Sequence, residues 1–327
     1  MAGADLDALD PECARVVREF LAEGLPEWHT LSVASARRLE DELFSGGDGP
    51  ELAATREFAI EGPAGDELPL RAYRPAAEGP DGDKPDAAIS NRPTVVFSHG
   101  GGWTLGTLDS ADDICRELAA RTGALVLSVD YRLAPEHPFP AALDGAYRAT
   151  EWADANADAL GGGGPLVVAG TSAGGGLAAA VALRAAIEDG PDIAAQVLLY
   201  PMLDRDTTRA SYAEHGDGPL LTTADVCWFW SQYLRSPVDA HNPFAAPLRA
   251  DVDLLTEAPP AVVATAGVDP LRDEGRAYAD RLAAVDVPVT RVHEPDLCHG
   301  FCSLTDDVPA ADRAMDEICE GLAAHLA

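Results

Sequence analysis

From about Pro93 onward, short apolar runs alternate with stretches of helical periodicity. A short, uninterrupted apolar run predicts a strand that is buried on both faces, and intervening helices predict parallel strands joined by crossovers. The sequence therefore predicts an α/β fold, with a mostly parallel central sheet flanked by helices. The expected strands are Thr94–Ser98, Ala124–Val129, Leu166–Ala169, Gln196–Leu199, Ala261–Ala266 and Val287–His293, and the expected helices between them include Ala111–Arg121, Leu143–Ala157 and Glu274–Ala284.

The first part of the chain has a different pattern. Apolar residues three and four positions apart predict a helix over Pro11–Glu23, which Gly24 and Pro26 bring to an end. Two alternating segments, Glu57–Ile60 and Leu68–Tyr73, read as a pair of strands. Residues 76–91 are rich in proline, glycine and aspartate, and we expect a surface loop there.

Residues 204–255 interrupt the strand–helix rhythm and contain an aromatic-rich helical segment, Thr222–Leu234. We expect this insertion to fold with residues 1–50 as a helical cap over the sheet edge. The predicted division is a cap segment over 1–50, core over 51–203, cap insertion over 204–255 and core over 256–327. The aromatic residues of the insertion could line a pocket, but an apolar stripe at helical spacing more often packs in the core, which is the interpretation we favour: Trp228, Phe229, Trp230 and Tyr233.

A serine lies at the tip of a predicted strand–turn–helix. Ser172 sits in Gly-Thr-Ser-Ala-Gly, directly after the strand Leu166–Ala169 and before an alanine-rich helical segment. The outer glycines allow the strand and the helix to approach closely, and the turn exposes the hydroxyl beside the helix N-terminus. This pattern is typical of a nucleophile in acyl transfer.

Three glycines follow the strand Thr94–Ser98 in His-Gly-Gly-Gly-Trp. Their unobstructed N–H groups could stabilise an oxyanion. The predicted donors are the backbone N–H groups of Gly101, Gly102 and Ala173, the last being the residue after the serine. His99 precedes the glycines, and we interpret its ring as a structural support of this loop.

An acid and a base complete the pattern. Asp269 follows the strand Ala261–Ala266, at the strand end where α/β sheets carry their chemistry, and His299 follows the last predicted strand. The order serine, aspartate, histidine is that of the α/β-hydrolase layout. We predict a catalytic triad of Ser172, Asp269 and His299, in which Asp273 is the competing acid and is interpreted as a cap of its own helix.

These motifs, together with Asp130–Ala141 and the Asp-Pro-Leu-Arg-Asp segment 269–273, resemble the hormone-sensitive-lipase-like esterases, bacterial family IV. The resemblance runs from about Pro93 to Phe301 and implies an α/β-hydrolase fold with a helical cap. It implies hydrolysis of short- to medium-chain acyl esters by the three residues and three donors named above, and it allows a homodimer. Thr171 places the chain in the GTSAG branch. The Tyr131–Ala141 stretch resembles a structural support of the active-site floor.

Two other functions fit the same motifs. Arylformamidases have a similar glycine loop and would cleave an amide with the same triad. Plant gibberellin receptors share the fold and bind a ligand without hydrolysis, but they lack the catalytic histidine that His299 matches. A small-molecule ester remains the favoured substrate.

The net charge of the chain indicates the salt concentration of its environment rather than the reaction it catalyses. The formal net charge is −32, the acidic residues are spread along the chain, and Lys84 is the one lysine. Because molar salt screens self-repulsion, this composition predicts a salt-adapted protein that requires high salt for its fold and activity. A chain this acidic offers no basic face, so we expect no nucleic-acid partner.

The remaining expectations concern compartment and cofactors. The N-terminus has no apolar signal-like segment, and the uncharged stretch 161–183 contains Pro165 and several glycines, so we expect no membrane span. The six scattered cysteines are typical of a reducing cytoplasm. Cys298, His299 and Cys302 lack a second ligand pair, and neither a metal nor a cofactor is expected.

Overall fold

The computed structural model describes residues 6–46, 49–76 and 91–327. In these residues eight strands form one sheet in the order β1-β2-β4-β3-β5-β6-β7-β8. Strands β1 and β2 pair antiparallel with each other and β2 with β4, whereas every pairing from β4 to β8 is parallel. The mostly parallel sheet is therefore confirmed. The strands are β1 Ala54–Glu61, β2 Glu67–Arg74, β3 Thr94–Ser98, β4 Leu125–Val129, β5 Leu166–Thr171, β6 Ile193–Leu199, β7 Ala261–Val268 and β8 Val289–Cys298.

Burial explains why the central strands read as continuous apolar runs. All residues of β3, β4, β5 and β7 are buried, since helices cover both faces of the sheet. Alternate residues of β3 enter different cores: Val96 belongs to one cluster, and Val95 and Phe97 to the other. Strand β1 lies at one edge of the sheet and is mostly exposed.

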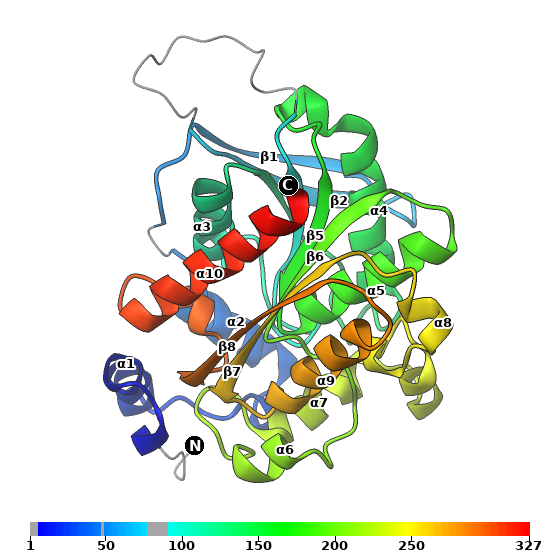
Figure 1. Ribbon diagram of the computed structural model, residues 1–327. Helices are drawn as coiled ribbons and strands as arrows, with labels where there is room; N and C mark the ends of the chain where they lie inside the picture. The colour runs from blue at the N-terminus through cyan, green and yellow to red at the C-terminus, as the bar shows by residue number, and fades with distance from the viewer. Residues whose placement is uncertain (1–5, 47–48, 77–90) are drawn as a thin grey trace.

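The two cores are closed by different helices, which Figure 1 shows on opposite faces of the sheet. Helices α4, α5 and α9 contribute to one cluster, and α1, α3 and α10 to the other. The α-helices are α1 Pro11–Ala22, α2 Val33–Phe44, α3 Asp112–Thr122, α4 Ala141–Asn156, α5 Ala173–Ile187, α6 Ala210–Glu214, α7 Thr223–Tyr233, α8 Val252–Leu255, α9 Arg272–Ala283 and α10 Pro309–Leu326.

The last strand differs most from its predicted bounds. Strand β8 begins at Val289 rather than Val287 and continues to Cys298, well past His293. Its second half contains the polar run Glu294–Asp296, which hides a strand from an apolar pattern. Such residues are tolerated because, among the strands of the described residues, β8 is the other edge of the sheet and pairs only with β7. Most of the predicted 76–91 loop lies outside the described residues.

The N-terminal helices and the 204–255 region lie together at the end of the sheet where the parallel strands finish, as Figure 1 shows for α2, α6 and α7. The indole N–H of Trp28 donates to the Leu220 carbonyl at 3.2 Å. The backbone N–H of His29 donates to the Asp225 carboxylate at 2.9 Å, and the His29 ring lies 3.0 Å from the same oxygen. Asp225, which is fully buried, also accepts from the backbone and hydroxyl of Thr222. One buried carboxylate thus joins the two segments. None of the helices in the described residues is long and apolar enough to cross a membrane.

Candidate active site

Ser172 occupies a sharp turn between β5 and α5. Its backbone has φ 53° and ψ −119°, a conformation that is costly for a residue with a side chain. The surrounding backbone holds it in place: the Ser172 N–H donates to Leu199 at 2.8 Å, and its carbonyl accepts from Met202 at 2.9 Å. The result is a hydroxyl carried at the end of the sheet, as the motif predicts.

The two outer glycines of the motif allow this turn to form. A Cβ at Gly174 would lie 2.0 Å from the Ser98 carbonyl oxygen, and one at Gly170 would lie 2.3 Å from the Gly174 oxygen. Neither position can accept a side chain without moving the backbone. The close approach of β3, β5 and α5 therefore requires glycine at both sites.

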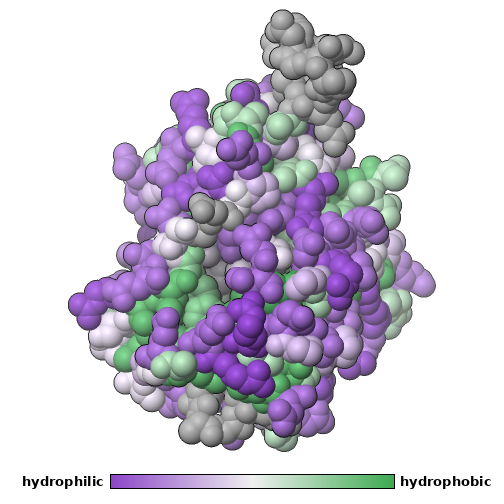
Figure 2. Space-filling view, turned by 90° about the vertical axis from the view of Figure 1, so that its left-hand side faces the viewer, coloured by the Kyte–Doolittle hydropathy of each residue, from purple (hydrophilic) through white to green (hydrophobic). Residues whose placement is uncertain are grey.

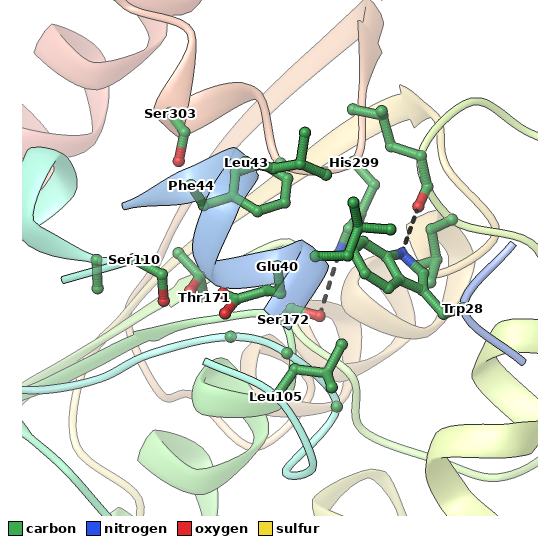
Figure 3. Close-up of a pocket in the computed structure, with 18 of the residues that line it drawn as sticks. Trp28, Glu40, Leu43, Phe44, Leu105, Ser110, Thr171, Ser172, His299 and Ser303 are labelled. Atoms are coloured by element: carbon green, nitrogen blue, oxygen red, sulfur yellow. Dashed lines mark hydrogen bonds between the residues drawn. The ribbon is translucent and has the colours of Figure 1, made fainter. Parts of the chain in front are cut away.

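A line of hydrogen bonds joins Ser172, His299 and Asp269, which come from three different strand ends. Figure 3 shows the part of it between Ser172 and His299. The Ser172 Oγ lies 3.0 Å from His299 Nε2. The His299 Nδ1 lies 2.8 Å from Asp269 Oδ2. The structure thus brings together all three residues that the sequence singled out as a triad.

Asp269 is held in one orientation. It follows β7 directly, it is fully buried, and its Oδ1 accepts from the Leu271 N–H at 2.8 Å. Its Oδ2 is thereby presented to His299 Nδ1, which must carry the proton of that hydrogen bond. Nε2 is then left with a lone pair toward Ser172, as a general base requires.

Asp273 does not act as predicted. Its carboxylate makes no capping hydrogen bond in α9. It accepts instead from the Ser211 N–H at 2.8 Å, at the start of α6, and pairs with Arg272 at 2.9 Å. The difference arises because the 204–255 region packs against α9, a contact that local sequence does not reveal. Asp273 is therefore separate from the His299 interaction.

The predicted oxyanion donors flank the serine. Gly101 and Gly102 have φ of 96° and 59°, and Ala173 begins α5. Within the described part of the chain, the N–H groups of these three residues have no hydrogen-bond acceptor. A Cβ at Gly102 would overlap the Phe229 ring at 2.0 Å, so glycine is required there as well.

His99 lies beneath this loop. Its ring is buried and stacks on Tyr131, with centroids 4.2 Å apart. Its Nδ1 lies 2.8 Å from the Gly100 carbonyl, and burial lowers the pKa of the ring to about 4. The neutral ring therefore donates to Gly100, while Tyr131 donates to the His99 carbonyl at 2.9 Å. Both side chains support the glycine loop.

Ser172 and His299 open onto a cavity of about 270 Å³. Much of its wall is apolar and comes from residues far from the triad in sequence. Figure 3 shows Leu43 and Phe44 of α2, and Trp28 ahead of it, around the serine. The apolar residues that line it include Phe20, Trp28, Leu39, Leu43, Phe44, Leu105 and Phe229.

The aromatic residues of α7 divide between cavity and core. Phe229 lines the cavity, whereas Trp230 and Tyr233 are buried against Trp103, with ring centroids at 4.6 and 4.0 Å. The core packing that the sequence favoured holds for Trp230 and Tyr233, whereas Phe229 takes the pocket alternative. Tyr200, at the end of β6, is a cavity residue that the sequence analysis missed, and its ring edge lies against His299 at 4.9 Å. Its place after a buried strand was the available signal.

Two acidic residues in the cavity were also missed. Glu40 of α2 and Asp113 of α3 both line it, near Ser110 and Ser303 respectively. Burial raises the pKa of Glu40 to about 7 and that of Asp113 to about 6. No sequence signal distinguishes these two carboxyl groups in a chain with 55 acidic residues.

The comparisons with known proteins agree with this geometry. A family model described as alpha/beta hydrolase fold matches residues 95–303. The chain is 42% identical to the carboxylic ester hydrolase LipN of Mycobacterium tuberculosis, covering 85% of this chain and 72% of LipN. It is also 42% identical to the esterase LipI of that organism, covering 81% and 80%.

A solved structure of an ester hydrolase from the metagenome of Lake Arreo is 37% identical and superimposes with a TM-score of 0.88, covering 97% of this chain and 99% of that one. This match extends over the N-terminal helices as well as the sheet. The chain therefore belongs to the α/β-hydrolase family that contains these carboxylic ester hydrolases.

Proposed function

We propose that this serine hydrolase cleaves short- to medium-chain acyl esters through an acyl-enzyme on Ser172. The observation that carries the proposal is the line of hydrogen bonds from Asp269 through His299 to Ser172, which ends at a mainly apolar cavity. A nucleophile, a base and an orienting acid at these distances are the requirements of acyl transfer.

In the first step, His299 Nε2 takes the proton of the Ser172 hydroxyl while Oγ attacks the ester carbonyl carbon. The imidazolium that forms is stabilised by the Asp269 carboxylate, which keeps its own charge. The carbonyl oxygen becomes an anion, and we assign its stabilisation to the N–H groups of Gly101, Gly102 and Ala173.

The second half of the reaction reverses these roles. His299 returns its proton to the departing alcohol oxygen, which breaks the ester bond and leaves the acyl group on Ser172. A water molecule then gives its proton to Nε2 and attacks the acyl carbon, and the serine leaves with that proton. No cofactor is needed for either half.

The chain-length range rests on the cavity and its wall. A cavity of about 270 Å³ is at the small end for binding sites and favours short acyl groups. We infer that residues 1–50 and 204–255 form the cap that closes it, since Phe20, Leu43 and Phe229 line it from these segments. The same proposal places the chain in the GTSAG branch and in the cytoplasm, with its thiols reduced. It includes no nucleic-acid partner, and it allows a homodimer.

Hydrolysis of p-nitrophenyl acetate, butyrate, octanoate and palmitate, together with labelling by a p-nitrophenyl phosphonate, tests this function. We expect the highest kcat/KM at acetate or butyrate and none at palmitate. The phosphonate should add one phosphonyl group, located by peptide mass spectrometry on Ser172, and inactivation should follow the same time course. Labelling without ester turnover, but with cleavage of an N-formyl arylamine, would instead favour the amide reaction. Labelling at another residue would contradict the assignment of the nucleophile.

We also propose that the protein is adapted to salt. Acidic residues such as Asp251, Asp253 and Glu257 are exposed, and Figure 2 shows a face on which hydrophilic residues predominate. With a net charge of −32, their mutual repulsion opposes folding in dilute buffer.

Molar salt is therefore expected to stabilise the fold. Raising NaCl from 0.05 to 2 M reduces the Debye length to a few Å and should raise Tm by roughly 10 °C or more. Circular dichroism melting measures the shift, and sucrose at equal osmolality controls for solute exclusion. An unchanged Tm, with full activity in dilute buffer, would contradict salt adaptation.

A further inference from the structure

The cavity beside Ser172 has one acidic end. We define this acidic end as Glu40, Ser110, Asp113 and Ser303, all of which line the cavity. Figure 3 shows the Glu40 side chain directed from α2 toward Thr171 and Ser110, within the same space as Ser172. The catalytic steps described above use none of these four residues.

Among the described residues that line the cavity, the acidic end has no cationic counterpart. Of the described residues that line it, none is lysine or arginine, and His299 is the one side chain that can become a cation. The nearby Arg37, one turn before Glu40 in α2, pairs with Glu136 at 2.7 Å and donates to the carbonyls of Thr104 and Ala134. The Arg37 guanidinium is therefore paired with these groups rather than with Glu40.

Glu40 is also shielded from water. Its residue is 7% exposed, and the Ser110 hydroxyl and the Gly106 N–H stabilise its ionised form. A charge in a low-dielectric site acts strongly on another charge placed beside it. A carboxylate on a bound substrate would meet this group without a neutralising partner.

We propose that the acidic end of the cavity selects the ester by charge: Glu40, assisted by Asp113, rejects esters whose chain carries a carboxylate and leaves uncharged esters as the substrate class. The proposal rests on the ester hydrolysis proposed above. Half-esters of dicarboxylic acids are then poor substrates even when their size fits the cavity. Glu40 is thus a specificity-determining residue and takes no part in the chemical steps.

The selection should depend on pH, since a neutral Glu40 no longer repels a carboxylate. Burial places the Glu40 pKa at about 7 and the Asp113 pKa at about 6. Asp41 of its own helix and Tyr131 also interact electrostatically with Glu40, and His299 and Tyr200 are the other titratable groups of the same cavity. The preference is a ratio of two esters measured on the same enzyme, so a pH effect on the chemical steps that both esters share cancels.

The test compares kcat/KM for ethyl butyrate with that for ethyl hydrogen succinate, which has the same acyl length and a carboxylate in place of the methyl group. A second pair, propyl butyrate and carboxymethyl butyrate, places the charge on the alcohol side. All assays contain 1 M KCl, which screens the field of the exposed acidic surface. In at least one pair at pH 8, the wild type should prefer the neutral ester by roughly 30-fold or more, and the preference should fall severalfold at pH 6.

Glu40→Gln should reduce the preference at pH 8 by roughly tenfold and remove its change between pH 7 and 8. Glu42→Gln, an exposed change of the same charge on the same helix, should keep the wild-type preference. Equal hydrolysis of both esters in both pairs by the wild type, or a preference that neither pH nor Glu40→Gln alters, would overturn the proposal.

Two further controls keep the outcome decisive. If Glu40→Gln does not fold, the pH dependence of the wild-type preference decides alone. Absence of ethyl butyrate hydrolysis by a folded wild-type protein would instead overturn the proposed function on which this inference rests.

Discussion

Ser172→Ala is expected to lower kcat for p-nitrophenyl butyrate at least ~10³-fold, since it removes the atom that we propose forms the acyl-enzyme. Any residual rate would come from binding and from the backbone N–H groups of the glycine loop, which alanine leaves in place. The variant should remain folded, because the turn is held by backbone hydrogen bonds, from the Ser172 N–H to the Leu199 carbonyl and from the Met202 N–H to the Ser172 carbonyl, and not by the hydroxyl.

Steady-state kinetics with a matched variant measures this loss. Ser231→Ala removes an exposed hydroxyl on α7 that donates to the Trp228 carbonyl and accepts from the Gln232 amide, and it should keep the wild-type rate. A Ser172→Ala protein with a native circular dichroism spectrum and more than a tenth of the wild-type kcat would contradict nucleophilic catalysis by Ser172.

Asp269→Asn is expected to lower kcat by about 10⁴-fold with little change in fold, for a reason visible in the hydrogen bonds around it. The Leu271 N–H donates to Oδ1 and would keep the amide oxygen of the asparagine in that place. The amide N–H₂ group would then face His299 Nδ1 and donate to it. Nε2 would have to carry the proton, and the lone pair that accepts the Ser172 proton would be lost.

Asp273→Asn provides the comparison, since it makes the same replacement of a carboxylate by an amide at the competing acid. Asp273 bonds to Ser211 and Arg272 and lies outside the His299 line, so its loss should cost less than tenfold in kcat. The measurement is kcat for p-nitrophenyl butyrate in both variants. A larger loss in Asp273→Asn than in Asp269→Asn would reverse the assignment of the acid.

The sheet and the three catalytic candidates could be predicted because their signals are local. Strand β3 matches its predicted bounds, since all five of its residues are buried and apolar burial on both faces leaves a continuous run. Ser172 and its flanking glycines are specified by backbone sterics within five residues. Asp269 and His299 each come after a predicted strand, and the carboxyl ends of parallel strands lie at the same end of the sheet.

The remainder depends on contacts between distant segments. The bounds of β8 were missed because an edge strand tolerates the polar run Glu294–Asp296. Asp273 was misassigned because its partner Ser211 lies in another element, 62 positions away. Glu40 reaches the cavity only through the packing of α2, which its own sequence does not determine.

The wall of the cavity comes largely from segments that carry none of the proposed catalytic residues. Phe20, Leu43 and Phe229 belong to helices outside the sheet, whereas Ser172, Asp269 and His299 are fixed at its strand ends. Substitutions in those helices can therefore reshape the space around an ester while the reacting atoms keep their positions. An ancestral enzyme with this arrangement could acquire new substrates through changes in its peripheral helices alone. Its substrate range could then evolve while its catalytic residues stayed the same.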